Sequence, residues 1–200
     1  MMFKRTLENA WVFDLKQRLV TGGFRSMRQA FQAHFPLNSL RDQHILDVGC
    51  GTGLCTAKLF DAQNNYVVGI DFNDHYIKLA QRLYPDIHFI VGEAESLPKY
   101  RHFFDVVLIS SVLHHLSDDQ SLSLFESLQT SMTDQATILV SEPIWSSNAF
   151  SNFLLRRDRG QFVKDKPGYL NLLNPNFRIE KAFEYTYAKT QFMGAILKLK

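Results

Sequence analysis

The residues best suited to chemistry lie in one stretch, Asp47-Val48-Gly49-Cys50-Gly51-Thr52-Gly53. Three glycines within five positions remove side chains from this turn, so its backbone can adopt positive φ and approach a bound molecule closely. An apolar run at 44–46 precedes it, and a helix-like run at 54–60 follows it. The pattern predicts a strand, a glycine turn and a helix whose first N–H groups point at a ligand. In an open parallel sheet, ligands bind at this carboxyl end of the strand.

A second candidate is the acid that ends the next apolar run, Tyr66-Val67-Val68-Gly69-Ile70-Asp71. Asp71 lies about 20 residues beyond the turn, where an acid can accept both hydroxyls of a ribose. The alternative is that Asp71 only caps a helix beginning near residue 73 or 74.

The glycine spacing excludes two common nucleotide sites. A dinucleotide fingerprint, G-x-G-x-x-G, would need glycine where Leu54 or Thr56 stands. A phosphate-binding loop would need Gly-Lys-Ser/Thr at the end of the turn, and Lys58 comes too late for that pattern. What remains is Asp-x-Gly-x-Gly-x-Gly.

The elements that must position these residues alternate between two kinds. Runs such as Phe104-Asp105-Val106-Val107-Leu108-Ile109 are continuously apolar apart from one acid, as expected for strands buried on both faces. Strands alternating with helices predict an α/β fold with a doubly wound parallel sheet. Strands are predicted over 44–49, 66–71, 87–91, 104–110 and 136–141, and helices over 54–61, 74–84 and 118–131.

The flanks follow other patterns. Residues 6–35 predict two helices split at Gly22-Gly23, the second ending at Pro36, within an N-terminal helical cap over 1–40. This cap either packs on the sheet or covers a ligand. Residues 144–175 predict a lid insertion with one or two helices. Residues 176–187 and 190–199 alternate like two antiparallel strands.

Composition sets bounds on the class of protein. The 200 residues suit one domain, 1–200, with an ordinary hydrophobic content of 46% and charged content of 21%. A net charge of +2 is too small to predict nucleic-acid binding. Cys50 and Cys55 form neither a disulfide framework nor a metal-like cluster. Charged residues interrupt any signal-like core near the start, and no run reaches the ~20 apolar residues of a membrane span. We expect a cytoplasmic protein without a metal.

The turn, followed by a strand ending in an acid, resembles motif I of the class I S-adenosylmethionine-dependent methyltransferases, in particular their small-molecule, type 11/25-like group. Three further segments resemble this family: 92–98, which reads Gly-Glu-Ala-Glu-Ser-Leu-Pro, Leu113-His114-His115-Leu116, and Glu142-Pro143. One departure is Thr133-Asp134-Gln135-Ala136, where the family has a Gly-Gly turn before the fifth strand.

The resemblance implies a Rossmann-like seven-stranded sheet in the order 3-2-1-4-5-7-6, with strand seven antiparallel. It implies S-adenosylmethionine as the cofactor, with Glu93 in place of the usual Asp and the backbone amide of Ala94 holding the adenine. The residues expected at the cofactor are Asp47, Gly49, Cys50, Gly51, Thr52, Gly53, Asp71, Phe72, Glu93, Ala94 and Ser110.

Methyl transfer needs an aligned nucleophile and exclusion of water, and a hydroxyl nucleophile also needs a base. His114 and His115 are candidate bases; as neighbours they can point to opposite sides, so at most one is expected to reach an acceptor. Glu142 is a third candidate, with orientation of a histidine as its alternative role. Arg157, Arg159 and Tyr169 of the lid are expected to contact the acceptor, although the arginines could simply form a solvated charged face.

Three functions compete. The first is a methyltransferase acting on an O- or N-nucleophile of a small metabolite. The second is an RNA or protein methyltransferase, disfavoured because Ser110-Ser111-Val112-Leu113 replaces the amide-nitrogen motif Asn/Asp-Pro-Pro-Tyr. The third is a non-catalytic partner protein, disfavoured because a scaffold would not need the intact turn and Asp71. The residues do not indicate the acceptor or the oligomeric state.

Overall fold

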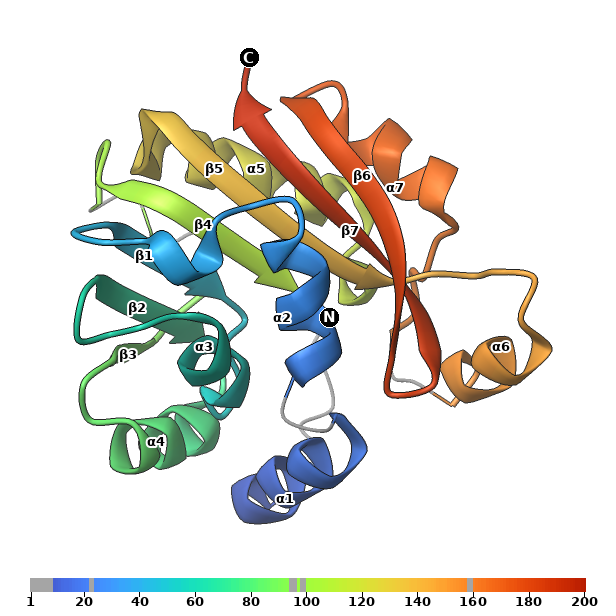
Figure 1. Ribbon diagram of the computed structural model, residues 1–200, viewed down its shortest axis with the longest axis horizontal. Coiled ribbons are helices and arrows are strands. Elements are labelled where there is room, and N and C mark those ends of the chain that lie inside the picture. The colour runs from blue at the N-terminus through green and yellow to red at the C-terminus, as the bar shows by residue number, and fades with distance from the viewer. Residues whose placement is uncertain (1–8, 22–23, 94–96, 98–99, 158–159) are drawn as a thin grey trace.

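The computed structural model describes residues 9–21, 24–93, 97, 100–157 and 160–200, and is built around one seven-stranded sheet (Figure 1). The strand order is β3-β2-β1-β4-β5-β7-β6. The first five strands run parallel, and β7 runs antiparallel to both of its neighbours. The predicted α/β class, strand order and antiparallel seventh strand are confirmed.

The strands are β1 (His44–Val48), β2 (Tyr66–Asp71), β3 (His88–Val91), β4 (Phe104–Ser110), β5 (Met132–Pro143), β6 (Phe177–Tyr187) and β7 (Thr190–Leu199). The helices are α1 (Ala10–Thr21), α2 (Arg25–Gln32), α3 (Leu54–Leu59), α4 (Asp74–Leu83), α5 (Asp118–Ser131), α6 (Ala149–Leu155) and α7 (Lys166–Leu173), with short 3-10 turns η2 (Leu37–Ser39) and η4 (Leu113–His115). Within the described ranges, no helix is long and apolar enough to cross a bilayer.

Two hydrophobic cores cover the two faces of the sheet. Val106 and Leu108 of β4 point into the core beneath α2, α3 and α4, whereas Val107 and Ile109 point into the core beneath α5 and α7. Successive strand residues face opposite sides, so a strand between two cores must be apolar at nearly every position. In Figure 1, α2 lies in front of the sheet and α5 behind it.

The start of β5 differs from the prediction. The strand begins at Met132, whereas 136 was expected, and its pairing with β4 jumps from Phe104↔Met132 to Val106↔Thr137. The segment 133–136 is therefore an irregular part of the strand and not a turn before it. Thr133 stabilises this shape by donating its hydroxyl to Asp105 Oδ1 over 3.2 Å.

The segment predicted to form a lid, 144–175, contains two helices that lie in different places. The helix α6 lies beyond the edge where β4 and β5 end (Figure 1), with Phe150 and Phe153 exposed. The helix α7 instead packs into the core through its buried apolar side chains. Only the part of the segment before α7 can act as a lid, so the predicted lid was too long.

Candidate active site

The glycine turn has the backbone geometry that its sequence predicts. Gly49, Gly51 and Gly53 have φ values of 70°, 56° and 76°, which side chains rarely adopt. A Cβ on Gly53 would lie 2.5 Å from the Phe89 ring. The turn is anchored to the neighbouring strand because Gly49 N–H and Cys50 N–H both donate to the Ile70 carbonyl, over 2.8 and 3.0 Å.

Asp71 links the ends of two strands. Its Oδ2 accepts the Gly51 N–H over 3.0 Å, and its Oδ1 accepts the Asn73 N–H over 2.8 Å. Burial raises the pKa of this carboxyl, and the two backbone donors oppose that shift. The cap of α4 is Asn73, whose side chain accepts from His75 and Tyr76. The alternative role for Asp71, a helix cap, is therefore wrong.

Asp47 lies beneath the turn. Its Oδ2 accepts the Thr56 hydroxyl over 2.5 Å, which ties β1 to α3. Burial raises the pKa of Asp47 to about 7, the Thr56 hydrogen bond opposes that shift, and the Asp71 charge adds to it. Asp47 therefore supports the turn from below, and its predicted contact with a cofactor stays a prediction.

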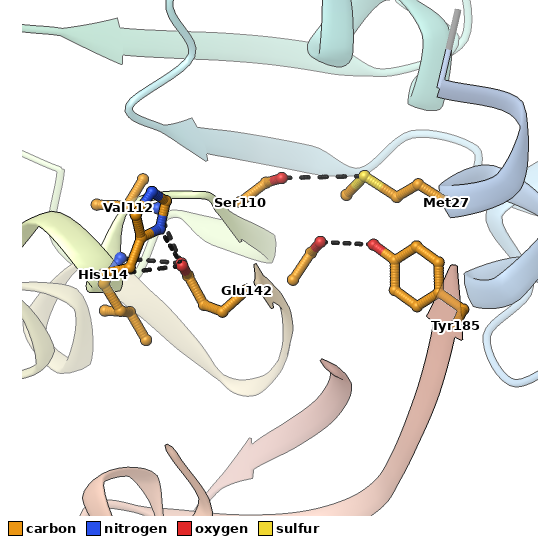
Figure 2. Close-up of polar contacts among 8 residues, drawn as sticks. Met27, Ser110, Val112, His114, Glu142 and Tyr185 are labelled. Atoms are coloured by element: carbon orange, nitrogen blue, oxygen red, sulfur yellow. Dashed lines mark hydrogen bonds and ion pairs between the residues drawn. The ribbon is translucent and has the colours of Figure 1, made fainter. Parts of the chain in front are cut away.

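Three other predicted residues occupy supporting positions. Cys50 is buried under the turn, its Sγ 2.9 Å from the place of a Cβ on Gly69. Thr52 is buried and donates its hydroxyl to Asp14 Oδ1 over 3.1 Å. Ser110, at the end of β4, faces Met27 of α2 (Figure 2).

The adenine end of the predicted site is more open. Phe72 directly follows Asp71 and has 63% of its surface exposed, so its ring is available to an apolar group. Glu93 is exposed. Ala94, the predicted adenine contact, lies outside the described residues.

These residues fit an adenosine-bearing cofactor. The turn offers backbone without side chains, the Asp71 carboxylate stands at its rim, and an exposed aromatic ring lies beside it. An aromatic side chain that remains exposed next to a buried acid has the chemistry to receive a base beside its ribose.

The second part of the candidate site is a buried pair, His114 and Glu142 (Figure 2). His114 Nδ1 lies 2.7 Å from Glu142 Oε2, and the two residues are 2% and 0% exposed. Glu142 Oε1 also accepts the N–H groups of Val112 and Leu113 over 2.8 and 2.9 Å. A carboxylate only accepts, so Nδ1 carries the proton in the neutral ring, and Nε2 is the basic nitrogen. Glu142 therefore orients His114, the alternative role foreseen for it.

His115 does not point away from His114. Both residues lie in the 3-10 turn η4, and their ring centroids are 4.0 Å apart. The expectation that adjacent histidines diverge is wrong here, because this turn brings both rings to one side. His115 is partly exposed, whereas His114 is buried.

The backbone at Gly160 and Phe162 lies against this pair. Gly160 lies so close to His114 that a Cβ on it would come within 2.1 Å of the imidazole Cδ2. Phe162 N–H donates to the His114 carbonyl over 2.9 Å, and Trp145 Nε1 donates to the Val163 carbonyl over 2.9 Å. The return of the lid is thus hydrogen-bonded to the histidine turn.

The three residues predicted to contact the acceptor lie in different environments or outside the described residues. The Arg157 guanidinium lies 3.7 Å from the Phe153 ring centroid, on the exposed face of α6. Arg159 lies outside the described residues. Tyr169 is 0% exposed within the core behind the sheet, which does not fit an acceptor contact, so we assign it to packing.

Some residues were missed from the sequence. Asp14 of α1 reaches the turn through Thr52, and the hydroxyls of Tyr185 and Ser141 meet over 2.6 Å at the ends of β6 and β5. A single acid among the apolar positions of α1 was a usable signal for Asp14. No local signal exists for Tyr185 and Ser141, since 44 residues separate them.

A doubly wound sheet of this order, with a glycine turn after β1 and an acid after β2, defines the Rossmann-like class of nucleotide-binding folds. The solved structure of 1,6-didemethyltoxoflavin-N1-methyltransferase from Burkholderia thailandensis, with bound S-adenosylhomocysteine, shares the fold at a TM-score of 0.70. The identity is 18%, and the match covers 94% of this chain and 83% of that one.

Within that class, residues 45–134 match the family described as a methyltransferase domain. The O-methyltransferase rstn1 of Aspergillus nomiae is 35% identical over 88 residues, 41% of this chain and 39% of that protein. The demethylmenaquinone methyltransferase of Renibacterium salmoninarum is 40% identical over 76 residues, 38% of this chain and 32% of that protein. The chain spans less than half the length of these curated relatives.

The family match and the fold together confirm the predicted resemblance. The matched segment, residues 45–134, contains the glycine turn, Asp71 and the turn that holds His114.

Proposed function

We propose that this protein transfers the methyl group of S-adenosylmethionine to a nucleophilic atom of a small molecule. The proposal rests on one observation: two groups of residues lie at the same edge of the sheet. The glycine turn and Asp71 end β1 and β2, and the His114–Glu142 pair ends β4 and β5. A cofactor on the first group and an acceptor beside the second would be neighbours, because parallel strands end at the same edge.

S-adenosylmethionine supplies an electrophilic methyl group with a neutral thioether as its leaving group. The protein's own residues then have three tasks. The turn and Asp71 hold the donor, the lid excludes water, and the basic Nε2 of His114 takes a proton from an acceptor hydroxyl or amine as it attacks. Glu142 fixes the tautomer that makes this possible.

The nature of the acceptor follows from charge and burial. The net charge is only +2, and the carboxylate and imidazole nearest the proposed acceptor position are buried. A small neutral or weakly acidic metabolite fits such a site better than a polyanion does. The two relatives described above act, by their names, as an O-methyltransferase and on demethylmenaquinone, which supports a small organic acceptor.

Isothermal titration calorimetry with S-adenosylmethionine, S-adenosylhomocysteine and NAD tests the donor part. We expect saturable binding of the first two at one site per chain and no binding of NAD. Binding of NAD in place of S-adenosylhomocysteine would contradict the proposal. The acceptor part is tested by transfer of labelled methyl from the donor to a library of phenols, amines and carboxylic acids, with Glu142→Gln as the inactive control.

A further inference from the structure

The helix α1 contributes a buried carboxylate to the glycine turn. Asp14 is 3% exposed, and its Oδ1 accepts the Thr52 hydroxyl over 3.1 Å. Its Oδ2 accepts from Arg18 Nε over 2.5 Å. Two more contacts hold α1 in place: the Phe13 ring stacks on Tyr76, with centroids 4.7 Å apart, and Arg18 donates to the Tyr84 hydroxyl over 2.8 Å. The helix thus closes over the turn with an acid at its centre.

Three acidic side chains gather there. In the described part of the chain, the carboxylates in hydrogen-bonding contact with this turn and the start of α3 are Asp14, Asp47 and Asp71. Among the described residues, Arg18 is the guanidinium paired with them, and its side chain is 43% exposed and therefore partly screened by solvent. A buried carboxylate is costly unless a cation or donor balances it, so the site is suited to a ligand that brings positive charge.

Two of these acids already have a use. Asp71 is the acid proposed for the ribose, and Asp47 holds Thr56 beneath the turn. Asp14 differs because it comes from α1. It is connected to Asp71 through two hydrogen bonds, Gly51 to Asp71 and Thr52 to Asp14, and Gly51 and Thr52 are neighbours in the chain. A carboxylate offers about four lone-pair positions. Thr52 and Arg18 use two of those on Asp14, which leaves capacity for further donors.

We propose that Asp14 receives the α-ammonium group of the cofactor's aminobutyrate tail, and that α1 closes on the turn through this ion pair. The inference rests on the proposed function. The tail extends from the ribose 5′ carbon, away from the base, so a ribose on Asp71 directs the tail along the turn toward α1. A buried ammonium–carboxylate pair is among the stronger polar contacts in proteins. Through this pair, α1 would recognise the tail of the cofactor.

Two ligands separate this role from simple docking of α1. S-adenosylhomocysteine carries the tail, whereas 5′-methylthioadenosine keeps the adenosine and thioether and lacks the tail. Calorimetry on the wild type should show tighter binding of the first. In Asp14→Asn we expect the affinity for S-adenosylhomocysteine to fall about tenfold or more, and that for 5′-methylthioadenosine to stay within about twofold. Asparagine retains the size of the side chain and can still accept from Thr52.

Two further variants act as controls. Asp74→Asn removes the same charge from α4, where Asp74 pairs with Lys78 on the surface, and should change neither affinity. Arg18→Gln removes the internal partner of Asp14 and keeps its charge, so the preference for the ligand with the tail should persist or increase. This variant also tests the inference if Asp14→Asn folds poorly by thermal unfolding.

The failures are distinguishable. If the wild type binds neither ligand, the proposed function itself fails. If the wild type binds both ligands and Asp14→Asn weakens both equally, Asp14 only docks the helix and the inference is overturned. The same holds if Arg18→Gln abolishes the preference as completely as Asp14→Asn does.

Discussion

The proposed cofactor side and the proposed acceptor side of this site are built in opposite ways. On the cofactor side, consecutive residues of one turn present backbone groups, and the acid opposite is only 20 residues away. On the acceptor side, a buried carboxylate holds three residues of a turn 28 to 30 positions distant, and the lid backbone lies on the imidazole. A site made of local backbone tolerates changes in distant side chains, whereas a site made of one buried pair depends on both partners.

The largest effect should come from the acceptor side. Glu142→Ala leaves the Val112 and Leu113 N–H groups and the His114 ring without their buried acceptor. Breaking such a buried pair costs about 3–5 kcal/mol, so we expect a much lower free energy of unfolding in denaturant titrations. An Ala variant as stable as the wild type would show that the pair is not structural.

Glu142→Gln tests the role of the His114–Glu142 pair without removing the side chain that fills this position. Glutamine can still accept the Val112 and Leu113 N–H groups, but its amide would donate to His114 Nδ1 and move the proton to Nε2. Nitrogen NMR of the His114 ring should report this change of tautomer, with affinity for S-adenosylhomocysteine retained. Once an acceptor is known, turnover should fall about a hundredfold. Unaltered turnover would remove His114 as the base.

On the cofactor side, Gly51→Val should abolish binding of S-adenosylhomocysteine. The φ of 56° at this residue is poorly tolerated by a β-branched side chain, at a cost of about 1–3 kcal/mol. Gly51→Ala is the graded control, because its Cβ would meet only Phe13 at an ordinary 3.6 Å. A valine variant that folds and binds normally would make the turn purely structural.

Asp71→Ala should have a smaller but specific effect. Loss of charge-assisted hydrogen bonds to the ribose should cost about 1.5–3 kcal/mol of binding, at least tenfold in the calorimetric affinity. The surface variant Asp74→Asn is the matched control. Equal affinity in Asp71→Ala and wild type would remove Asp71 from the site.

The raised pKa of Asp47 predicts that the free energy of unfolding depends on pH. Because this pKa is raised to about 7 in the folded state, folding takes up a proton between roughly pH 4 and pH 7. The stability from this group is therefore complete below its unfolded pKa and is lost as the pH rises through about 7. Denaturant unfolding of Asp47→Asn should show a flatter pH profile over this range. An identical slope in both proteins would refute the raised pKa.

The smallest effect is expected on the lid. Arg157 lies over the exposed Phe153 ring, a contact worth about 0.5–1 kcal/mol, so Arg157→Ala should leave stability and cofactor affinity nearly unchanged. If the lid contacts the acceptor, the variant lowers turnover alone. Limited proteolysis of residues 144–165 with and without S-adenosylhomocysteine separates a moving lid from a fixed wall, since only a moving lid gains protection.

The sequence predicted the geometry of the glycine turn well because that information is local. Positive φ at Gly51 and the reach of Asp71 follow from residue type and spacing. The acceptor side was predicted only in outline. Nothing near Gly160 shows that it must face His114, and Tyr169 in a lid-like segment gives no sign that α7 turns into the core. Both depend on how distant segments meet, which periodicity does not record.

The most direct test of the account is a crystal structure with S-adenosylhomocysteine. We expect the ribose hydroxyls within hydrogen-bonding distance of the Asp71 carboxylate, the base beside Phe72, and the thioether directed toward the His114 turn. A ligand bound elsewhere, or one over the turn with its ribose away from Asp71, would contradict the claim that this edge of the sheet is the methyl-donor site.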